Sequence, residues 1–144
     1  MMSPERAPIG LTLGSTAKVV SRAFDEALAA AGGSLPVWLT LLSVKTQKLA
    51  NQRKIAAGIG IQGATLTHHL NGMEAEGLLV RRRHPTNRRT HQVELTEAGE
   101  ALFLRLREAA IAFDKRLRTR FDEDEIADLD RLLAKLRANV GEQD

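Results

Sequence analysis

The sequence predicts a mainly α-helical fold with one small β-hairpin. Over most of the chain, apolar residues recur every three or four positions, which is the pattern of amphipathic helices. Two short stretches, residues 78–83 and 91–95, depart from it, and the second alternates apolar with polar side chains as a half-buried strand does. Pro85, Thr86 and Asn87 supply turn residues between them. Helices around a single hairpin are therefore the expected architecture.

Two helices are expected in the N-terminal part of the chain. The first lies within residues 8–31 and ends at the Gly32-Gly33 pair. The second begins near Pro36, because the first turn of a helix tolerates proline. Its apolar residues are Val37, Trp38, Leu41, Leu42 and Val44. Since Trp38 lies on this stripe, core packing is the interpretation we favour for its side chain.

The next two predicted helices form a helix-turn-helix. A short helix is expected over residues 52–57, and Gly58 and Gly60 break it. A longer helix follows over residues 63–76, with Gly77 as its C-terminal stop. Two helices joined by a tight turn that contains glycine are the arrangement of this motif.

The helix over residues 63–76 has a face suited to contact with DNA. Its buried stripe is expected to hold Leu66, Leu70 and Met73, with His69 partly buried beside them. The opposite face carries small and hydrogen-bonding side chains, whereas a face that is only solvated more often carries Lys and Glu. Such a helix fits a DNA major groove, where side chains of its first turns reach base edges. The candidate reader residues are Gln62, Gly63, Ala64, Thr65, Thr67, His68 and Asn71.

The predicted hairpin is strongly basic. Residues 81–91 contain five arginines and two histidines and no acidic residue. Such charge supplies salt-dependent affinity for phosphates, with Arg81, Arg82 and Arg83 on the first arm. Strand alternation sends Arg82 to one face and its two neighbours to the other. The candidate wing contacts are Arg82, Arg83, Thr86, Asn87, Arg88 and Arg89. A reader helix followed by a basic hairpin predicts a winged helix-turn-helix that binds double-stranded DNA.

The last third of the chain predicts two more helices, within residues 98–141. Thr96 is the expected N-cap of the first, and the acids from Asp122 to Glu125 mark the start of the second. The second has an apolar stripe spaced nearly as a heptad. It contains Ile126, Leu129, Leu133, Leu136 and Val140. Together with residues 8–31, these helices exceed what a lobe over residues 35–97 needs for its core, so we expect a homodimer.

Composition excludes several other classes of function. The chain has no cysteine, which excludes disulfides, thiolate zinc sites and redox switching by this chain. No apolar run approaches a membrane span of about 18 residues, and a signal peptide's apolar core is lacking, so we expect a cytoplasmic protein. His68 and His69 diverge on their helix, and His84 with His91 offers only two ligands, so no metal or other cofactor is expected. The sequence contains no recognisable catalytic motif, so we do not expect an enzyme.

On these residues the chain resembles the MarR family of bacterial transcriptional regulators. The resemblance extends from about Leu13 to Val140, and its most specific parts are LPVWLTLLSV, QGATLTHHLNGMEAEGLLVRR and RRTHQVELTEAG. It implies a homodimer with intertwined terminal helices and two winged helix-turn-helix lobes. It also implies binding to a pseudo-palindromic operator, repression of nearby genes, and release by a small organic ligand that is frequently aromatic.

The tip of the hairpin departs from the family's pattern. Asn87 and His84 stand where the family usually has aspartate, and the first of those aspartates commonly braces the arginine at the position of Arg89. Asn87 still accepts a hydrogen bond but without the charge-assisted component, so we expect a more mobile and more positive wing. Trp38 is only a weak candidate for the ligand pocket. The alternative is a winged-helix protein-interaction module whose basic hairpin binds an acidic partner instead of DNA.

Overall fold

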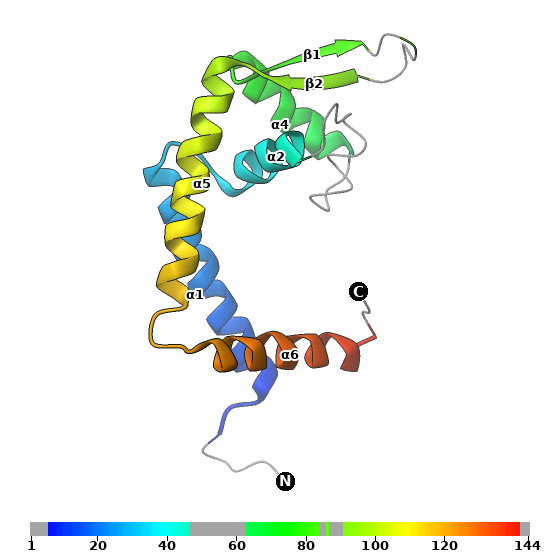
Figure 1. The fold of residues 1–144 in the computed structure, drawn as a ribbon. Coiled ribbons are helices and arrows are strands. Elements are labelled where there is room, and N and C mark those ends of the chain that lie inside the picture. The colour runs from blue at the N-terminus through cyan, green and yellow to red at the C-terminus, as the bar shows by residue number, and fades with distance from the viewer. Residues whose placement is uncertain (1–5, 47–62, 84–85, 87–90, 142–144) are drawn as a thin grey trace. The chain divides into compact units, whose positions relative to one another are not determined.

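The computed structural model describes residues 6–46, 63–83, 86 and 91–141, and it confirms a mainly α-helical fold with one hairpin (Figure 1). Its elements are α1 (Ile9–Ala30), α2 (Leu35–Thr46), α4 (Gly63–Ala75), β1 (Leu79–Arg83), β2 (His91–Leu95), α5 (Glu97–Leu117) and α6 (Glu123–Asn139). The helix expected over residues 52–57 lies outside the described residues. The chain divides into two compact units, residues 1–110 and 111–144.

The core of the first unit joins every element from α1 to the first part of α5. Its buried apolar residues are Leu28, Trp38, Leu41, Leu66, Leu70, Met73, Leu78, Leu79, Val93, Leu102, Phe103 and Leu106.

Among the described residues, no single helix is long and apolar enough to cross a membrane. Helices α1 and α2 meet the criteria of length and apolar composition only when taken together, as a pair bent by 74°.

The junction between α1 and α2 is a glycine-dependent turn. Gly32 has a φ of 95°, and the Gly33 N–H donates to the Leu28 carbonyl at 2.9 Å, which closes the end of α1 as a Schellman motif. The Ser34 hydroxyl then accepts from the Val37 N–H at 3.3 Å and caps α2. A Cβ atom at Gly33 would lie 2.7 Å from the Leu106 side chain, so glycine also allows this turn to pack against α5.

The end of α4 fixes the start of the hairpin. Gly77 has a φ of 76°, its N–H donates to the Glu74 carbonyl at 3.0 Å, and the Leu78 N–H donates to the Met73 carbonyl at 2.9 Å. This is a second Schellman motif, and it confirms Gly77 as the helix stop. Because Leu78 belongs to that turn, β1 begins at Leu79, one residue later than the sequence predicts. The strands pair antiparallel, from Leu79 opposite Leu95 to Arg83 opposite His91.

Thr96 ties the base of the hairpin to α5. Its N–H donates to the Leu78 carbonyl at 3.1 Å, and its hydroxyl donates to the Gly77 carbonyl at 2.5 Å. The same hydroxyl accepts from the Gly99 N–H at 3.1 Å, which confirms Thr96 as the N-cap of α5. The hairpin is therefore anchored at both strands to the first turn of that helix.

In the second unit, α6 begins with a capping box. The Asp122 carboxylate accepts from the Glu125 N–H at 2.8 Å, and the Glu125 carboxylate accepts from the Asp122 N–H at 3.1 Å. This confirms the acidic start that the sequence predicts. No residue of α6 is buried, and its apolar stripe includes the 45%-exposed Leu129 and ends at the 82%-exposed Val140.

Candidate nucleic-acid interface

Helix α4 has one buried face and one exposed face, as its sequence predicts. Leu66, Leu70 and Met73 are buried in the core of the first unit. Thr65, His68 and Asn71 are exposed. The three exposed side chains follow one another at intervals of three residues, so they form a row along the helix surface. The structure therefore places three of the predicted reader residues together on a solvent-facing surface.

The structure describes the remaining reader candidates in part. Thr67 is half-buried. Gly63 begins α4, so the backbone of Gly63 and Ala64 forms its first turn, where free N–H groups favour phosphate oxygens. Gln62 lies outside the described residues. His69 is half-buried, and its ring centre lies 6.0 Å from that of His68.

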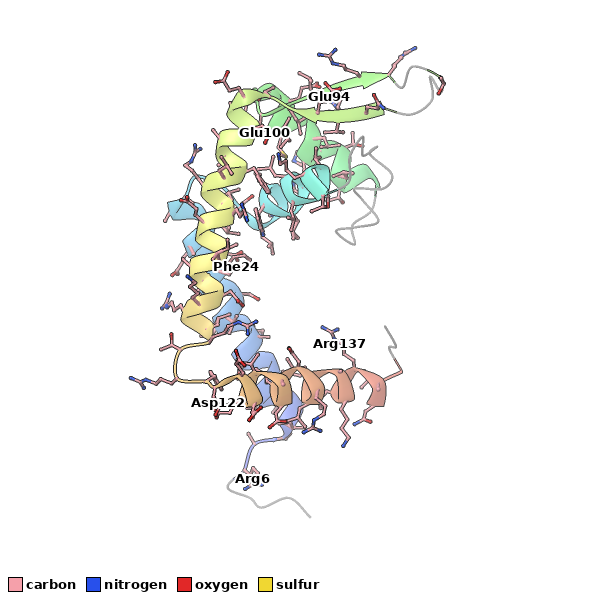
Figure 2. The ribbon with its side chains drawn as sticks, in the orientation of Figure 1. Arg6, Phe24, Glu94, Glu100, Asp122 and Arg137 are labelled. Carbon is pink, nitrogen blue, oxygen red and sulfur yellow. The ribbon has the colours of Figure 1, made fainter. Side chains whose placement is uncertain are left out.

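The first wing strand presents its arginines in two directions. Arg82 is 68% exposed and forms an ion pair with Glu94 of β2, with 3.4 Å between Arg82 Nε and Glu94 Oε2. Figure 2 labels Glu94 on this hairpin. An exposed pair of this kind contributes about 0–1 kcal/mol, so Arg82 can exchange its carboxylate partner for a phosphate at little cost. Arg83, at the end of β1, is also exposed.

Arg81 differs from its two neighbours because its side chain is only 19% exposed. It faces the same side of the hairpin as the buried Val93, with which it is paired in the strand register. Its guanidinium contacts Glu74, with 3.3 Å between Arg81 Nη2 and Glu74 Oε1, and it donates to Asn71 Oδ1. The alternation along β1 is thus as predicted, but one of the arginines expected on the first arm is engaged within the protein.

The sequence did not predict the contact between Glu74 and Arg81, although one signal points to it. Glu74 lies in the last turn of α4, where the negative end of the helix dipole disfavours a carboxylate. An acid at that position is more stable with a cationic partner close by. The chain reversal at Gly77 brings that partner from seven residues further along.

At the wing tip, Thr86 is exposed. His84, Asn87, Arg88 and Arg89 lie outside the described residues, so the brace between Asn87 and Arg89 stays a prediction.

Trp38 lies in the core, as the position of its side chain on the α2 stripe predicts. It is 8% exposed and stacks on Phe103 of α5, with ring centres 5.7 Å apart and planes inclined by 19°. The Lys45 ammonium lies 5.5 Å from the centre of the Phe103 ring and 2.9 Å from Glu100 Oε2. Figure 2 labels Glu100 near the start of α5. These contacts pack α2 against α5.

Comparison with known proteins identifies the domain that contains this surface. Residues 34–91 match the model of the MarR family. The match spans α2, α4 and β1 up to the first residue of β2. This segment is similar to the domain of MarR-family proteins. The resemblance inferred from the motifs of α2, α4 and the hairpin is thereby confirmed.

Solved structures of MarR-family regulators share this fold over most of the chain. The transcriptional repressor CouR, bound to a 23-mer DNA duplex, is 28% identical, and the match covers 90% of this chain and 92% of CouR with a TM-score of 0.79. CouR from Rhodococcus jostii RHA1 bound to p-coumaroyl-CoA matches at 24% identity, 89% and 90% coverage, and a TM-score of 0.74. A mutant MarR from E. coli complexed with operator DNA matches at 21% identity, 90% and 93% coverage, and a TM-score of 0.79.

Proposed function

We propose that this protein is a sequence-specific, DNA-binding transcriptional regulator, and that it acts as a homodimeric repressor released by a small organic ligand. The observation that carries the proposal is the exposed row of Thr65, His68 and Asn71 on α4, beside a hairpin with exposed arginines. The DNA-bound state of CouR, 28% identical over most of both chains, supports this interpretation.

In this proposal the two elements divide the work of binding. Helix α4 lies in the major groove, where a hydroxyl of Thr65 and the ring of His68 reach base edges. The hairpin follows the phosphate backbone, and Arg82, Arg83, Arg88 and Arg89 replace condensed counterions. Base contacts then set the sequence preference, while phosphate contacts set most of the affinity and its dependence on salt.

The homodimer is supported by apolar side chains that the single chain leaves exposed. They lie on the N-terminal half of α1, on α6 and at the C-cap of α6: Ile9, Leu11, Leu13, Val19, Leu129, Leu132 and Val140. Apolar patches of this kind mark sites of association. A two-fold axis would place the two α4 helices in successive major grooves, about 34 Å apart, on a pseudo-palindromic operator.

We propose that the releasing ligand acts on the spacing of the two α4 helices. A ligand that binds better to a dimer whose α4 helices no longer match successive grooves lowers the population that can hold the operator. Reciprocally, operator DNA weakens binding of that ligand by the same factor. Structures of proteins named CouR hold a DNA duplex in one case and p-coumaroyl-CoA in the other, so regulators of this fold bind both kinds of partner.

The proposal is tested by selecting genomic fragments with the purified protein and titrating the selected site with salt. We expect a pseudo-palindromic site, and a slope of log K against log salt of about −0.9 for each phosphate contact. Equal affinity for all sequences would contradict specific regulation. Binding to an acidic protein partner without DNA binding would instead support an interaction module.

Replacing His68 with alanine should change the preferred sequence. If His68 contacts a base edge, the variant loses about 1–3 kcal/mol on the selected site and discriminates less at one base pair. The measurement is competition binding against single-base variants of the site. His69→Ala is the matched control, because it removes the same ring from a half-buried position and should leave the preference unchanged. An unchanged His68→Ala preference would remove His68 from the reader surface.

Replacing Arg88 and Arg89 together with alanine should weaken binding to all DNA sequences alike. Each lost phosphate contact should make the salt slope shallower by about 0.9. Replacing Arg116, in the last turn of α5, and Arg118, just after that helix, with alanine removes the same charge from another part of the chain and should leave the slope unchanged. Equal slopes for the two double variants would show that net charge, and not the wing, drives binding.

A further inference from the structure

Three side chains connect the reader helix to the first wing strand. Glu74, in the last turn of α4, accepts from the backbone N–H of Arg81 at 3.1 Å and from its Nε at 3.4 Å. It also contacts Arg81 Nη2 at 3.3 Å. The same Nη2 donates to the Asn71 side chain, one turn earlier on α4. One guanidinium therefore contacts two side chains of the reader helix.

These contacts give a partner to the backbone N–H of Arg81 and to the carboxylate of Glu74. The Arg81 N–H is a donor of β1 that is directed to Glu74, so the carboxylate caps a strand whose partner, β2, lies on its other side. The guanidinium offsets the repulsion between that carboxylate and the negative end of the α4 dipole. With its side chain 19% exposed, Arg81 is more shielded than Arg82, whose side chain is 68% exposed. The positive charge of Arg81 is therefore paired with Glu74 within the protein.

The contact with Arg81 also determines which way the Asn71 amide points. A guanidinium has five donors and no acceptor, so only the amide oxygen of Asn71 can face it. The amide NH₂ group is then left for partners in solvent, because the residue is exposed. Bidentate recognition of adenine requires the amide oxygen and nitrogen together. Because Arg81 engages the oxygen, the group that Asn71 has free for DNA is its NH₂ group, a donor.

We propose that Arg81, held by Glu74, is a positioning residue that fixes the wing strand against the reader helix and presents Asn71 to DNA as a donor only. The partner of Asn71 is then a hydrogen-bond acceptor: a phosphate oxygen, or an acceptor such as O6 or N7 on a base edge. The inference rests on the proposed DNA-binding function. It assigns Arg81 no direct contact with DNA, in contrast to what its charge alone suggests.

Substitutions of Glu74 give opposite results for a positioning role and for a purely electrostatic one. Glu74→Gln removes a negative charge beside the proposed DNA surface, so electrostatics alone would strengthen binding. If Glu74 positions Arg81, the variant instead loses roughly tenfold in affinity for the selected site, the order of one good base contact. Glu76→Gln is the matched control, since it makes the same change two residues away at an exposed position with no ion pair to a described residue. It should bind as tightly as the wild type or more tightly.

Substitutions of Arg81 separate positioning from a phosphate contact. Lysine binds phosphate as a point charge but cannot reproduce a planar fork on Glu74 and Asn71. We therefore expect Arg81→Lys to lose roughly tenfold on the selected site, nearly as much as Arg81→Ala, with the salt slope unchanged in both. Wild-type affinity in Arg81→Lys, together with a slope shallower by about 0.9 in Arg81→Ala, would assign Arg81 to the phosphates and overturn the proposal. Thermal melts identify any variant that fails to fold.

Asn71→Asp tests the donor. Aspartate keeps an acceptor for Arg81 but removes the NH₂ group, so we expect a melting temperature no lower than that of the wild type and weaker DNA binding. Asn71→Ala then distinguishes the two acceptors: it weakens all sequences alike if the partner is a phosphate, and alters preference at one base pair if it is a base edge. Wild-type binding by Asn71→Asp would overturn the donor role. If the wild-type protein selects no sequence at all, DNA recognition itself fails, and the positioning role fails with it.

Discussion

Replacing Gly99 with alanine should destabilise the protein by about 3 kcal/mol, because the new methyl group would force the packed backbone apart. A Cβ atom at Gly99 would lie 1.9 Å from the Leu78 carbonyl oxygen and 3.0 Å from the carbonyl carbon. That carbonyl is part of the backbone and accepts from the Thr96 N–H at 3.1 Å, so it cannot rotate away as the end of a side chain would. Urea unfolding at one fixed protein concentration measures the loss.

Gly72→Ala is the control for this prediction. Gly72 lies within α4, is exposed, and has no atom within 4 Å of a Cβ built on it. Alanine there should stabilise the helix by about 0.5–1 kcal/mol, because glycine loses more conformational freedom on folding. The same added methyl group thus has opposite expected effects at two positions. Equal stability of the two variants would contradict the close approach between α5 and the base of the hairpin.

Much of the first unit could be predicted from sequence because its signals are local. The sequence predicts a helix over residues 63–76, and α4 extends over Gly63–Ala75. It is ended by Gly77 in the left-handed conformation that glycine favours. The sequence predicts a strand over residues 91–95, and β2 occupies this range. Each of these features depends on periodicity or on a terminal residue within a few positions, which a single sequence records directly.

The contacts that position the candidate site are not local and could not be predicted in the same way. Glu74 and Arg81 are seven residues apart across a turn and a strand start, so neither helical nor strand periodicity pairs them. The alternation along β1 places Arg81 and Arg82 on opposite faces of the strand. It does not indicate which of the two faces packs against α4. The sequence around Gly99 does not indicate why glycine is needed there. Its role depends on the position of the Leu78 carbonyl, which precedes the hairpin.

The apolar stripe of α6 leads to the second large effect: Leu129→Glu should reduce operator affinity by about 100-fold or more. No residue of α6 is buried within the chain, and Leu129 is 45% exposed. In the proposed homodimer this stripe packs against the partner, so a buried carboxylate without a cation would oppose association. Two linked reader helices gain about 10²–10⁴ in affinity over a single one, and a monomer loses that gain.

Sedimentation at micromolar concentration and operator titration together test this prediction. Ala134→Glu is the matched control, because it adds the same charge to α6 about 140° around the helix from Leu129, at an exposed position. It should remain a dimer and bind the operator like the wild type. If Leu129→Glu is monomeric yet binds a single half-site with the affinity that a monomeric lobe retains, the defect lies in association alone and the reader surface is intact. If it remains a dimer with full operator affinity, α6 does not contribute to the interface, and the exposed apolar residues of α1 would have to supply it.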